Sequence, residues 1–258
     1  MDNTEPGRTA TPLRGVLLDL DGTILDHDGA VTRALAGWLP ELDVASTDQT
    51  RRLWFAAQDR HLVAWRRREI SFAEQRRRRL RDSLPAVGVP VPADDAALDG
   101  VFHGYLRHYE RSWQAYDDVP AALAAIAAAG LCTAVLTNGS TRQQHDKLAR
   151  IGLTGRLGPV YTAEELAVAK PSPDAFLAAC RRWGLPPGAV LHVGDDHDLD
   201  VRAAREAGLH AVHLDRTGTG PAGEPLRIAS LRELPALLAP ARWVTPQPTV
   251  LPPGADRP

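Results

Sequence analysis

Lysine is scarce in this chain. Of the 30 basic residues among its 258, only Lys147 and Lys170 are lysine, so arginine supplies nearly all of the positive charge. An ammonium group is compact, whereas a guanidinium group is a broad plane. The two lysines are therefore expected preferentially at places that need a small, concentrated charge.

Apolar runs long enough to cross a membrane are also missing. No run approaches the roughly 18 residues that a spanning helix needs. The basic residues nearly balance the 32 acidic ones, and the net charge is −2. An even balance does not indicate binding to nucleic acid or to a membrane surface. We therefore expect a small soluble molecule as the partner, and neither a membrane nor a nucleic acid.

Only two cysteines are present, too few for a disulfide framework. Cys132 lies in an apolar run and Cys180 in a helical pattern, so both are expected to be small buried side chains. The polar stretch Met1–Arg14 has no apolar signal core and is predicted to be a disordered lead. These features predict a cytoplasmic protein that is a monomer or a homodimer.

Short apolar runs alternate with helical patterns over much of the chain. The predicted strands are 16–19, 132–136, 160–162, 190–193 and 211–214. The predicted helices between and after them are 121–129, 141–150, 173–183, 199–207 and 231–238. This alternation predicts an α/β fold, a Rossmann-like parallel sheet with helices on both faces.

Residues 26–117 break the alternation, because their apolar side chains recur at helical spacing and no strand pattern is found. We therefore expect an all-helical domain at 26–117, inserted into an α/β core made of 15–25 and 118–240. The proline-rich stretch 241–258 is predicted to be a disordered tail.

Polar clusters follow three of the predicted strands. They are Asp19 and Asp21, Thr137 and Asn138, and Asp195 and Asp196, and Lys170 stands just before a helix. The carboxyl ends of parallel strands meet at one edge of a sheet, where ligands bind. The sequence thus predicts one site built from all four segments.

The chemistry of these residues favours phosphoryl transfer. Asp19 is predicted to be a carboxylate nucleophile, and Asp21 to exchange protons with the leaving group and water. Mg²⁺ prefers oxygen ligands, so we expect it to be held by Asp19, Asp195 and the backbone carbonyl of Asp21. Asp196 or Asp200 is expected to orient the water molecules of the ion or to hold Lys170.

Groups that meet the transferring phosphate are expected after the second strand. Thr137 offers a hydroxyl, Asn138 an amide, and Asn138 and Gly139 offer backbone N–H groups. Lys170 supplies positive charge to the nucleophile and to the phosphate.

The chain resembles the haloacid dehalogenase superfamily in four ordered motifs. They are Asp19-Leu20-Asp21-Gly22-Thr23, Thr137-Asn138-Gly139, Lys170-Pro171 and Gly194-Asp195-Asp196-His197-Asp198-Leu199-Asp200. The resemblance implies that the helical insert is the cap called C1, and that Mg²⁺ supports a phosphatase reaction in which Asp19 is phosphorylated. Leu199 departs from the pattern, because relatives often carry asparagine there.

Two features refine the expected reaction. Dehalogenases of the superfamily lack the acid that Asp21 provides, so its presence favours a phosphomonoester hydrolase. The spacing of Gln144 and Lys147 after Thr137 resembles enzymes acting on nucleotides and sugar phosphates. Alternatives on the same scaffold are a phosphomutase and a dehalogenase.

The segment 51–81 carries eleven arginines and three acids. It is interpreted as a solvated helix surface, with a basic lid or a non-catalytic surface for nucleic acid or a protein partner as alternatives. Trp54 and Trp65 are expected in the core, and Lys147 on a helix surface. His27, just after the first motif, is kept as a candidate for substrate contact.

Overall fold

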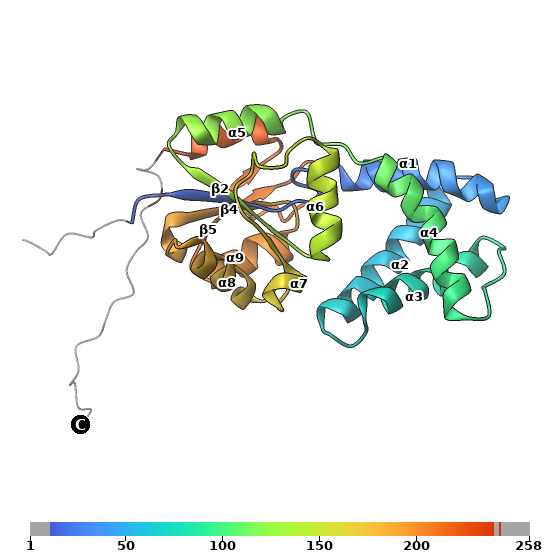
Figure 1. Ribbon diagram of the computed structural model, residues 1–258. Helices are drawn as coiled ribbons and strands as arrows, with labels where there is room; N and C mark the ends of the chain where they lie inside the picture. The colour runs from blue at the N-terminus through green and yellow to red at the C-terminus, as the bar shows by residue number, and fades with distance from the viewer. Residues whose placement is uncertain (1–10, 240–242, 244–258) are drawn as a thin grey trace, which may run out of the picture.

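The computed structural model describes residues 11–239 and 243, and a parallel sheet of six strands lies beside a group of helices (Figure 1). The strand order is β3-β2-β1-β4-β5-β6. The strands are β1 Gly15–Leu18, β2 Cys132–Thr137, β3 Val160–Thr162, β4 Val190–Gly194, β5 His210–Leu214 and β6 Arg227–Ile228. The predicted parallel α/β fold is confirmed, and the five predicted strands are all present. The edge strand β6 was missed because it has only two residues.

Strand β1 is fully buried because helices cover both faces of the sheet. Val16 packs on one side, in a core that includes α5 (Val119–Ala128) and the 3₁₀-helix Leu231–Leu237. Leu17 packs on the other side, in a core that includes α8 (Pro173–Trp183) and α9 (Ala203–Glu206). Figure 1 shows α5 above the sheet and α8 and α9 below it. Burial on both faces explains why β1 reads as a continuous apolar run.

The register of β1 brings three strand ends together. Leu18 lies opposite Val135 of β2 and Val193 of β4. The switch point of the sheet therefore lies between β1 and its two neighbours, where the chain continues into the predicted polar clusters.

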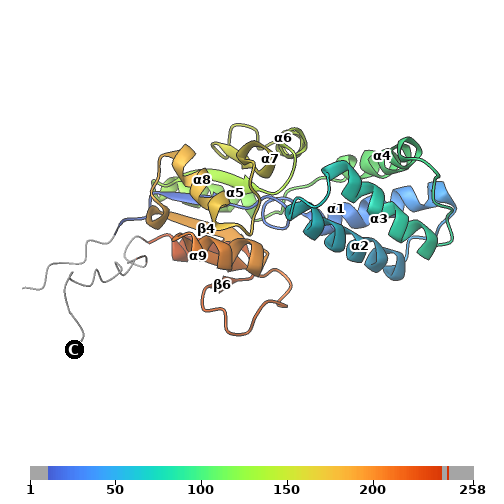
Figure 2. The same ribbon diagram turned by 90° about the horizontal axis from the view of Figure 1, so that it is seen from below.

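Residues 26–114 form helices and loops without any strand, and Figure 2 shows them to one side of the sheet. We call residues 26–117 the helical module. Its helices are α1 His27–Trp38, a 3₁₀ turn Leu39–Leu42, α2 Asp48–Arg66, α3 Phe72–Ala86 and α4 Asp95–Arg111. Its core is aromatic, because Trp54 stacks on Phe102 and packs against Tyr105 at a ring distance of 4.5 Å.

The chain enters and leaves the helical module through two adjacent segments. The N–H of Asp26 donates to the carbonyl of Gln114, and the N–H of Tyr116 donates to the carbonyl of Ile24. The Asp26 carboxylate also caps α1 by accepting from the N–H of Gly29. The module thus joins the sheet next to the loop that carries Asp19 and Asp21.

Three local predictions need correction. The predicted helix 199–207 is a π-helical turn, His197–Arg202, followed by the short α9. The helix predicted at 231–238 is a 3₁₀-helix that contains Pro235, which lacks the N–H an α-helix would use. Cys132 is exposed, because it is the first residue of β2 and the strand becomes buried only further along, whereas Cys180 is buried as expected.

The predicted lead and tail fall almost entirely outside the described residues. Of the lead, residues 11–14 are described, and Leu13 is buried. Of the tail, Trp243 is described and buried, and its indole N–H donates to the carbonyl of Leu237 at 2.6 Å. Among the described residues, no helix combines the length and apolarity that a bilayer crossing requires.

Candidate active site

Three carboxylates meet where β1 and β4 end. Oxygen atoms of Asp19, Asp195 and Asp200 lie within 4.8 Å of one another. Asp19 follows β1 directly, and Asp195 follows β4. The π-helical turn after β4 brings Asp200 back to the same point, where it is 1% exposed. Strand register and one irregular turn therefore assemble the cluster.

Lys170 is the ammonium group of this cluster. Its Nζ lies 2.5 Å from an oxygen of Asp19 and 2.5 Å from an oxygen of Asp200, and it is 3% exposed. Burial would lower the pKa of Lys170, but the two carboxylates raise it above its ordinary value. The expected role of holding Lys170 thus falls to Asp200 together with Asp19.

One ammonium does not neutralise three carboxylates this close together, of which Asp19 and Asp200 are buried. Burial raises the pKa of Asp19 to about 7 despite Lys170, and Asp200 adds to the rise. Burial and the charges of Asp19 and Asp200 raise the pKa of Asp195 well above its ordinary value. Buried like charges of this kind are stabilised when a cation joins them.

The donor set fits Mg²⁺, which takes oxygen ligands and binds through one or two carboxylates. Asp19 and Asp195 offer such oxygens at the right edge of the sheet. Gly22 makes room for them: a Cβ there would lie 2.1 Å from Oδ2 of Asp195, and its φ of +87° favours glycine. The part assigned to the Asp21 carbonyl stays a prediction.

Asp21 is held by Lys147, which corrects the expectation that Lys147 lies on a helix surface. Lys147 is 3% exposed, and its Nζ lies 2.7 and 2.6 Å from the two carboxylate oxygens of Asp21. Lys147 projects from α6 (Thr141–Arg150), which follows β2 and packs back over the first loop. Gln144, one turn earlier, also donates to Asp21 at 3.2 Å. The position of Lys147 in the predicted helix did not indicate its contact with Asp21. The scarcity of lysine in the chain did indicate that Lys147 has a special role.

The two aspartates of the first motif are in different protonation environments. Burial raises the pKa of Asp21, but the charge and hydrogen bonds of Lys147, with a hydrogen bond from Gln144, hold it below its ordinary value. Asp19, by contrast, has a raised pKa. Asp21 is therefore ionised at neutral pH in this arrangement.

Residues after β2 line the same cavity as the carboxylates. The Thr137 hydroxyl accepts from Gln144 at 2.5 Å. The side chain of Asn138 is already used, since it donates to the carbonyl of Lys170 and accepts from the N–H of Lys170, both at 2.9 Å. Asn138 therefore positions Lys170 in this structure through its carbonyl oxygen and one of its two amide N–H groups. Its expected contact with a phosphate stays a prediction.

Asp196 and His197 lie apart from the carboxylate cluster. The Asp196 carboxylate caps the turn by accepting from the N–H groups of Asp198 and Leu199. His197 contacts Glu224 through Nε2 at 3.2 Å. Of the two residues expected beside the metal, the structure thus brings Asp200 into the cluster and leaves Asp196 at its rim.

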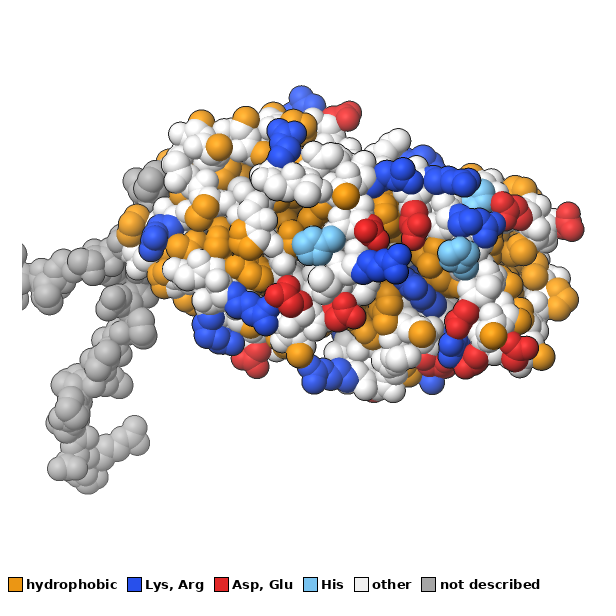
Figure 3. Space-filling model, viewed as in Figure 1, with side chains coloured by type: hydrophobic (Ala, Val, Ile, Leu, Met, Phe, Trp, Pro, Cys, Tyr) orange, Lys and Arg blue, Asp and Glu red, His pale blue; other side chains and the backbone are white. Residues whose placement is uncertain are grey.

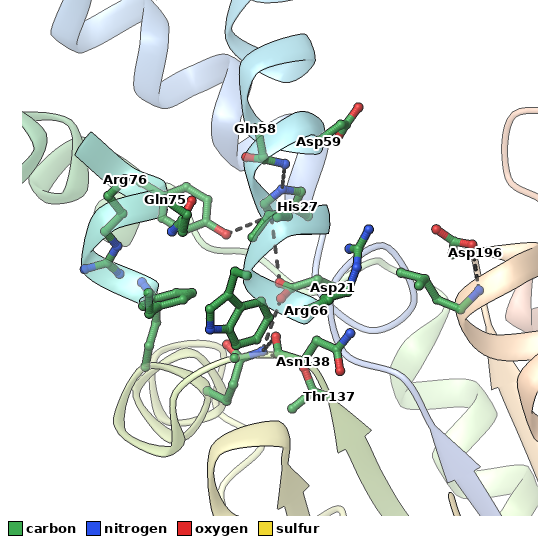
Figure 4. Close-up of a pocket in the computed structure, with 18 of the residues that line it drawn as sticks. Asp21, His27, Gln58, Asp59, Arg66, Gln75, Arg76, Thr137, Asn138 and Asp196 are labelled. Atoms are coloured by element: carbon green, nitrogen blue, oxygen red, sulfur yellow. Dashed lines mark hydrogen bonds and ion pairs between the residues drawn. The ribbon is translucent and has the colours of Figure 1, made fainter. Parts of the chain in front are cut away.

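The helical module covers this site, and the two together line a cavity of about 490 Å³. Figure 4 shows Gln58 and His27 above Asp21, with Thr137 and Asn138 on the opposite side. His27 Nδ1 lies 2.8 Å from the Tyr109 hydroxyl and 3.9 Å from Asp21. Trp65, expected in the core, is half-buried and lines the cavity, whereas Trp54 is buried as predicted.

The arginines of segment 51–81 do not form a uniform basic surface. Figure 3 shows acidic and basic side chains mixed over the helical module. Six of the eleven arginines form ion pairs, namely Arg51, Arg60, Arg67, Arg77, Arg78 and Arg81. Three others, Arg66, Arg76 and Arg79, line the cavity. The segment is therefore neither a purely solvated surface nor an open basic patch.

A parallel α/β sheet with this carboxylate cluster at its switch point defines a hydrolase scaffold. The family model of the haloacid dehalogenase-like hydrolases matches residues 13–208, and the chain belongs to that family. The family predicted from the four motifs is confirmed.

Curated relatives are phosphatases. The chain is 38% identical over 128 residues to a phosphoserine phosphatase of Thermus thermophilus, covering 48% of this chain and 51% of that protein. It is 29% identical over 201 residues to an N-acetylmuramic acid 6-phosphate phosphatase of Pseudomonas aeruginosa, covering 76% and 79%. The chain thus spans about half the length of the first and most of the second. These relatives support the prediction of a phosphatase-type enzyme.

Solved structures agree on the fold. The HAD-hydrolase YfnB of Bacillus subtilis, bound to magnesium, superposes with a TM-score of 0.76 at 22% identity, covering 89% of this chain and all of that one. A dehalogenase captured with an intermediate superposes with a TM-score of 0.71 at 26% identity, covering 88% and 98%. Fold similarity alone therefore does not separate phosphatase from dehalogenase.

Proposed function

We propose that this protein is a Mg²⁺-dependent phosphomonoester hydrolase acting on a small phosphorylated metabolite, in the class of nucleotides and sugar phosphates. One observation carries the proposal. A buried carboxylate held by an ammonium, Asp19 with Lys170, opens onto a cavity beside a second, separately held carboxylate, Asp21. A binding protein has no need of this pair.

In the proposed reaction, an oxygen of Asp19 attacks the phosphorus atom, and the bond from phosphorus to the leaving oxygen breaks. Asp21 gives a proton to that oxygen, and an alcohol leaves. Water then attacks the phosphorus of the aspartyl-phosphate and loses a proton to Asp21, so Asp19 and inorganic phosphate are released. Lys170 favours the ionised form of Asp19 and offsets charge on the phosphate. A bound Mg²⁺ would supply further positive charge to the phosphate oxygens.

The protonation of Asp21 sets the order of events. Asp21 is ionised beside Lys147, so it needs a proton before it can serve as an acid. A phosphate dianion entering the cavity adds negative charge nearby, and this raises the pKa of Asp21. We propose that substrate binding protonates Asp21 and that the next step uses the same carboxylate as a base.

The helical module is proposed to act as the cap of this site. It contributes more than half of the residues that line the cavity, including Gln58, Trp65 and Arg79. Closing a cap over substrate excludes water and selects the group attached to the phosphate. The cytoplasmic location and the monomeric or dimeric state stay predictions.

The alternative functions require different features of the site. A phosphomutase must return the phosphoryl group to the sugar, and a dehalogenase does not need an acid at Asp21. Binding of nucleic acid by the module is disfavoured by its ion-paired arginines.

The deciding experiment measures phosphate release from p-nitrophenyl phosphate with Mg²⁺ and with EDTA, beside halide release from 2-chloropropionate. We expect phosphate release in the presence of Mg²⁺ and not in the presence of EDTA, and no halide release. A panel of nucleotides, sugar phosphates and phosphoglycolate then ranks substrates. Halide release without phosphate release would make the chain a dehalogenase, and tight DNA binding with a steep salt dependence would favour the binding alternative.

A further inference from the structure

Two arginines at the far end of the cavity have no carboxylate partner. Arg76 and Arg79 lie on α3 at a spacing of three residues, so they share a face of the helix, and both line the cavity. Each guanidinium instead covers aromatic rings, Arg76 over Phe72 at 4.6 Å and Arg79 over Trp54 at 4.5 Å. Within residues 11–239 and 243, neither forms an ion pair.

The other arginines of α3 differ from these two. Arg77 donates to both carboxylate oxygens of Asp99 at 2.8 and 2.6 Å. Arg78 and Arg81 pair with Glu74 at 2.9 and 3.1 Å. The outward-facing arginines thus have acidic partners on the module, and the two that face the cavity have none.

Arg79 is also deeply buried, at 6% exposure. One of its N–H groups donates to Oε1 of Gln58 at 2.9 Å, but its Nε has no hydrogen-bond partner. The Oε1 of Gln75, one turn before Arg79, is likewise unpartnered, and Gln75 is 1% exposed. Buried polar groups rarely stay unpaired, so each such group needs an explanation. Figure 4 shows Gln75 and Arg76 at the side of the cavity away from Thr137.

Among the described residues, no carboxylate forms an ion pair with the two arginines at the far end of the cavity. Asp28 and Asp59 also line the cavity, but neither is ion-paired with Arg76 or Arg79. The largest influences on Asp59 are burial, which raises its pKa, and Arg66, which lowers it. Asp59 therefore interacts more strongly with Arg66 than with Arg79.

We infer that Arg79, with Arg76, binds a second anionic group of the substrate, and that the substrate is a phosphomonoester bearing a carboxylate or a second phosphate at its other end. This deepens the proposed function and rests on it for the phosphoester end. A guanidinium presents a planar fork that matches either anion. The aromatic rings beneath it exclude water, which strengthens that contact.

Two side chains connect the reacting end of the cavity to its far end. His27 and Gln58 lie between Asp21 and Arg79, with Gln58 Nε2 at 3.2 Å from His27 Nε2. Two side chains therefore separate the reacting end from the far end. The wall between them includes Phe55, Leu62 and Leu106.

The same contacts orient His27. A guanidinium only donates, so Gln58 turns its oxygen to Arg79 and its NH₂ group to Nε2 of His27. Nδ1 of the neutral imidazole then carries the hydrogen and faces Tyr109 and Asp21. Arg79 thus also acts as a positioning residue for the groups around Asp21.

The first test uses the unmodified full-length chain and pairs of compounds that differ by one anion. Phosphoserine is compared with phosphoethanolamine for a carboxylate, and fructose 1,6-bisphosphate with fructose 6-phosphate for a second phosphate. In at least one pair, we expect the compound with two anionic groups to exceed its partner tenfold or more in kcat/KM. The pair that shows this difference identifies the second anion as a carboxylate or a phosphate. Equal values within both pairs overturn the inference.

The second test replaces the arginine. In Arg79→Met, the preference for the doubly anionic compound should fall at least tenfold through KM, and Arg79→Lys should retain part of it. Arg78→Met on the same helix is the matched control and should keep the preference. A preference that survives Arg79→Met overturns the assignment, and circular dichroism shows whether each variant folds.

Isothermal titration of the same compounds separates this inference from the proposed function. If p-nitrophenyl phosphate is not hydrolysed, the proposed function fails. The far site is then still supported if the doubly anionic compound binds tenfold tighter than its partner to the unmodified chain and Arg79→Met removes the difference. Equal binding of both compounds overturns it.

Discussion

Replacing Lys147 by methionine tests the contact that the sequence did not reveal. Methionine keeps the length of the side chain and removes the ammonium that holds Asp21 at 2.6 Å. Hydrogen bonds to charged groups contribute about 1.5–3 kcal/mol, and breaking a fully buried pair costs about 3–5 kcal/mol. The Asp21 side chain is 27% exposed and keeps Gln144, so the lower range applies. We expect Lys147→Met to lower the free energy of unfolding by about 2 kcal/mol at pH 7.

The pH dependence of this loss follows from the sign of the shift. Lys147 helps to hold the pKa of Asp21 below its ordinary value, so the pair stabilises the fold above the unfolded aspartate pKa of about 3.9. This contribution is lost as the pH falls through the lower pKa of the folded state. Urea unfolding followed by circular dichroism should therefore give a constant difference between wild type and variant from pH 8 to pH 5, and a shrinking one below about pH 4.

Kinetics supply the second measurement for Lys147→Met. A displaced Asp21 transfers protons poorly, and we expect kcat for p-nitrophenyl phosphate to fall about 10²-fold. Arg142→Met on the same helix is the control, because its pair with Asp146 is exposed and 3.7 Å long. If Lys147→Met unfolds and turns over like the control, then Lys147 does not organise Asp21 and the reasoning is wrong.

The remaining predictions concern the nucleophile, the metal and the glycine loop. Asp19→Asn should lower kcat at least 10³-fold and abolish the phosphorylated protein detected by mass spectrometry after a rapid acid quench; a phosphorylated Asp19→Asn protein would move the nucleophile elsewhere. Because burial raises the pKa of Asp19 to about 7, protons compete with Mg²⁺ below that pH. Calorimetry should then show proton release and about a tenfold loss of affinity per pH unit below pH 7, and pH-independent binding would contradict it. Gly22→Ala should weaken Mg²⁺ binding at least tenfold, since its Cβ would lie 2.1 Å from Asp195 Oδ2; unchanged affinity would exclude a crowded loop.

Much of the fold could be predicted because each signal was local. Short apolar runs of three to five residues marked the strands, and β1, which is buried on both faces, shows no polar interruption. Glycine and proline marked helix ends, as at the start of α8. Irregular turns escaped prediction, since the π-helical turn at His197–Arg202 follows from where Asp200 and Lys170 meet and not from local preference.

The sequence by itself determined the core of the site, because strand ends in a parallel sheet converge whatever surrounds them. Asp19, Asp195 and Lys170 could be grouped from their positions after strands and before a helix, and the structure brings them together. Tertiary structure alone decided what surrounds this group. Helix packing turned Lys147 inward to Asp21 and placed Arg79, without a carboxylate partner, at the far end of the cavity. Which face of a helix is buried depends on distant segments, and in an arginine-rich helix such as α3 every position looks equally suited to solvent.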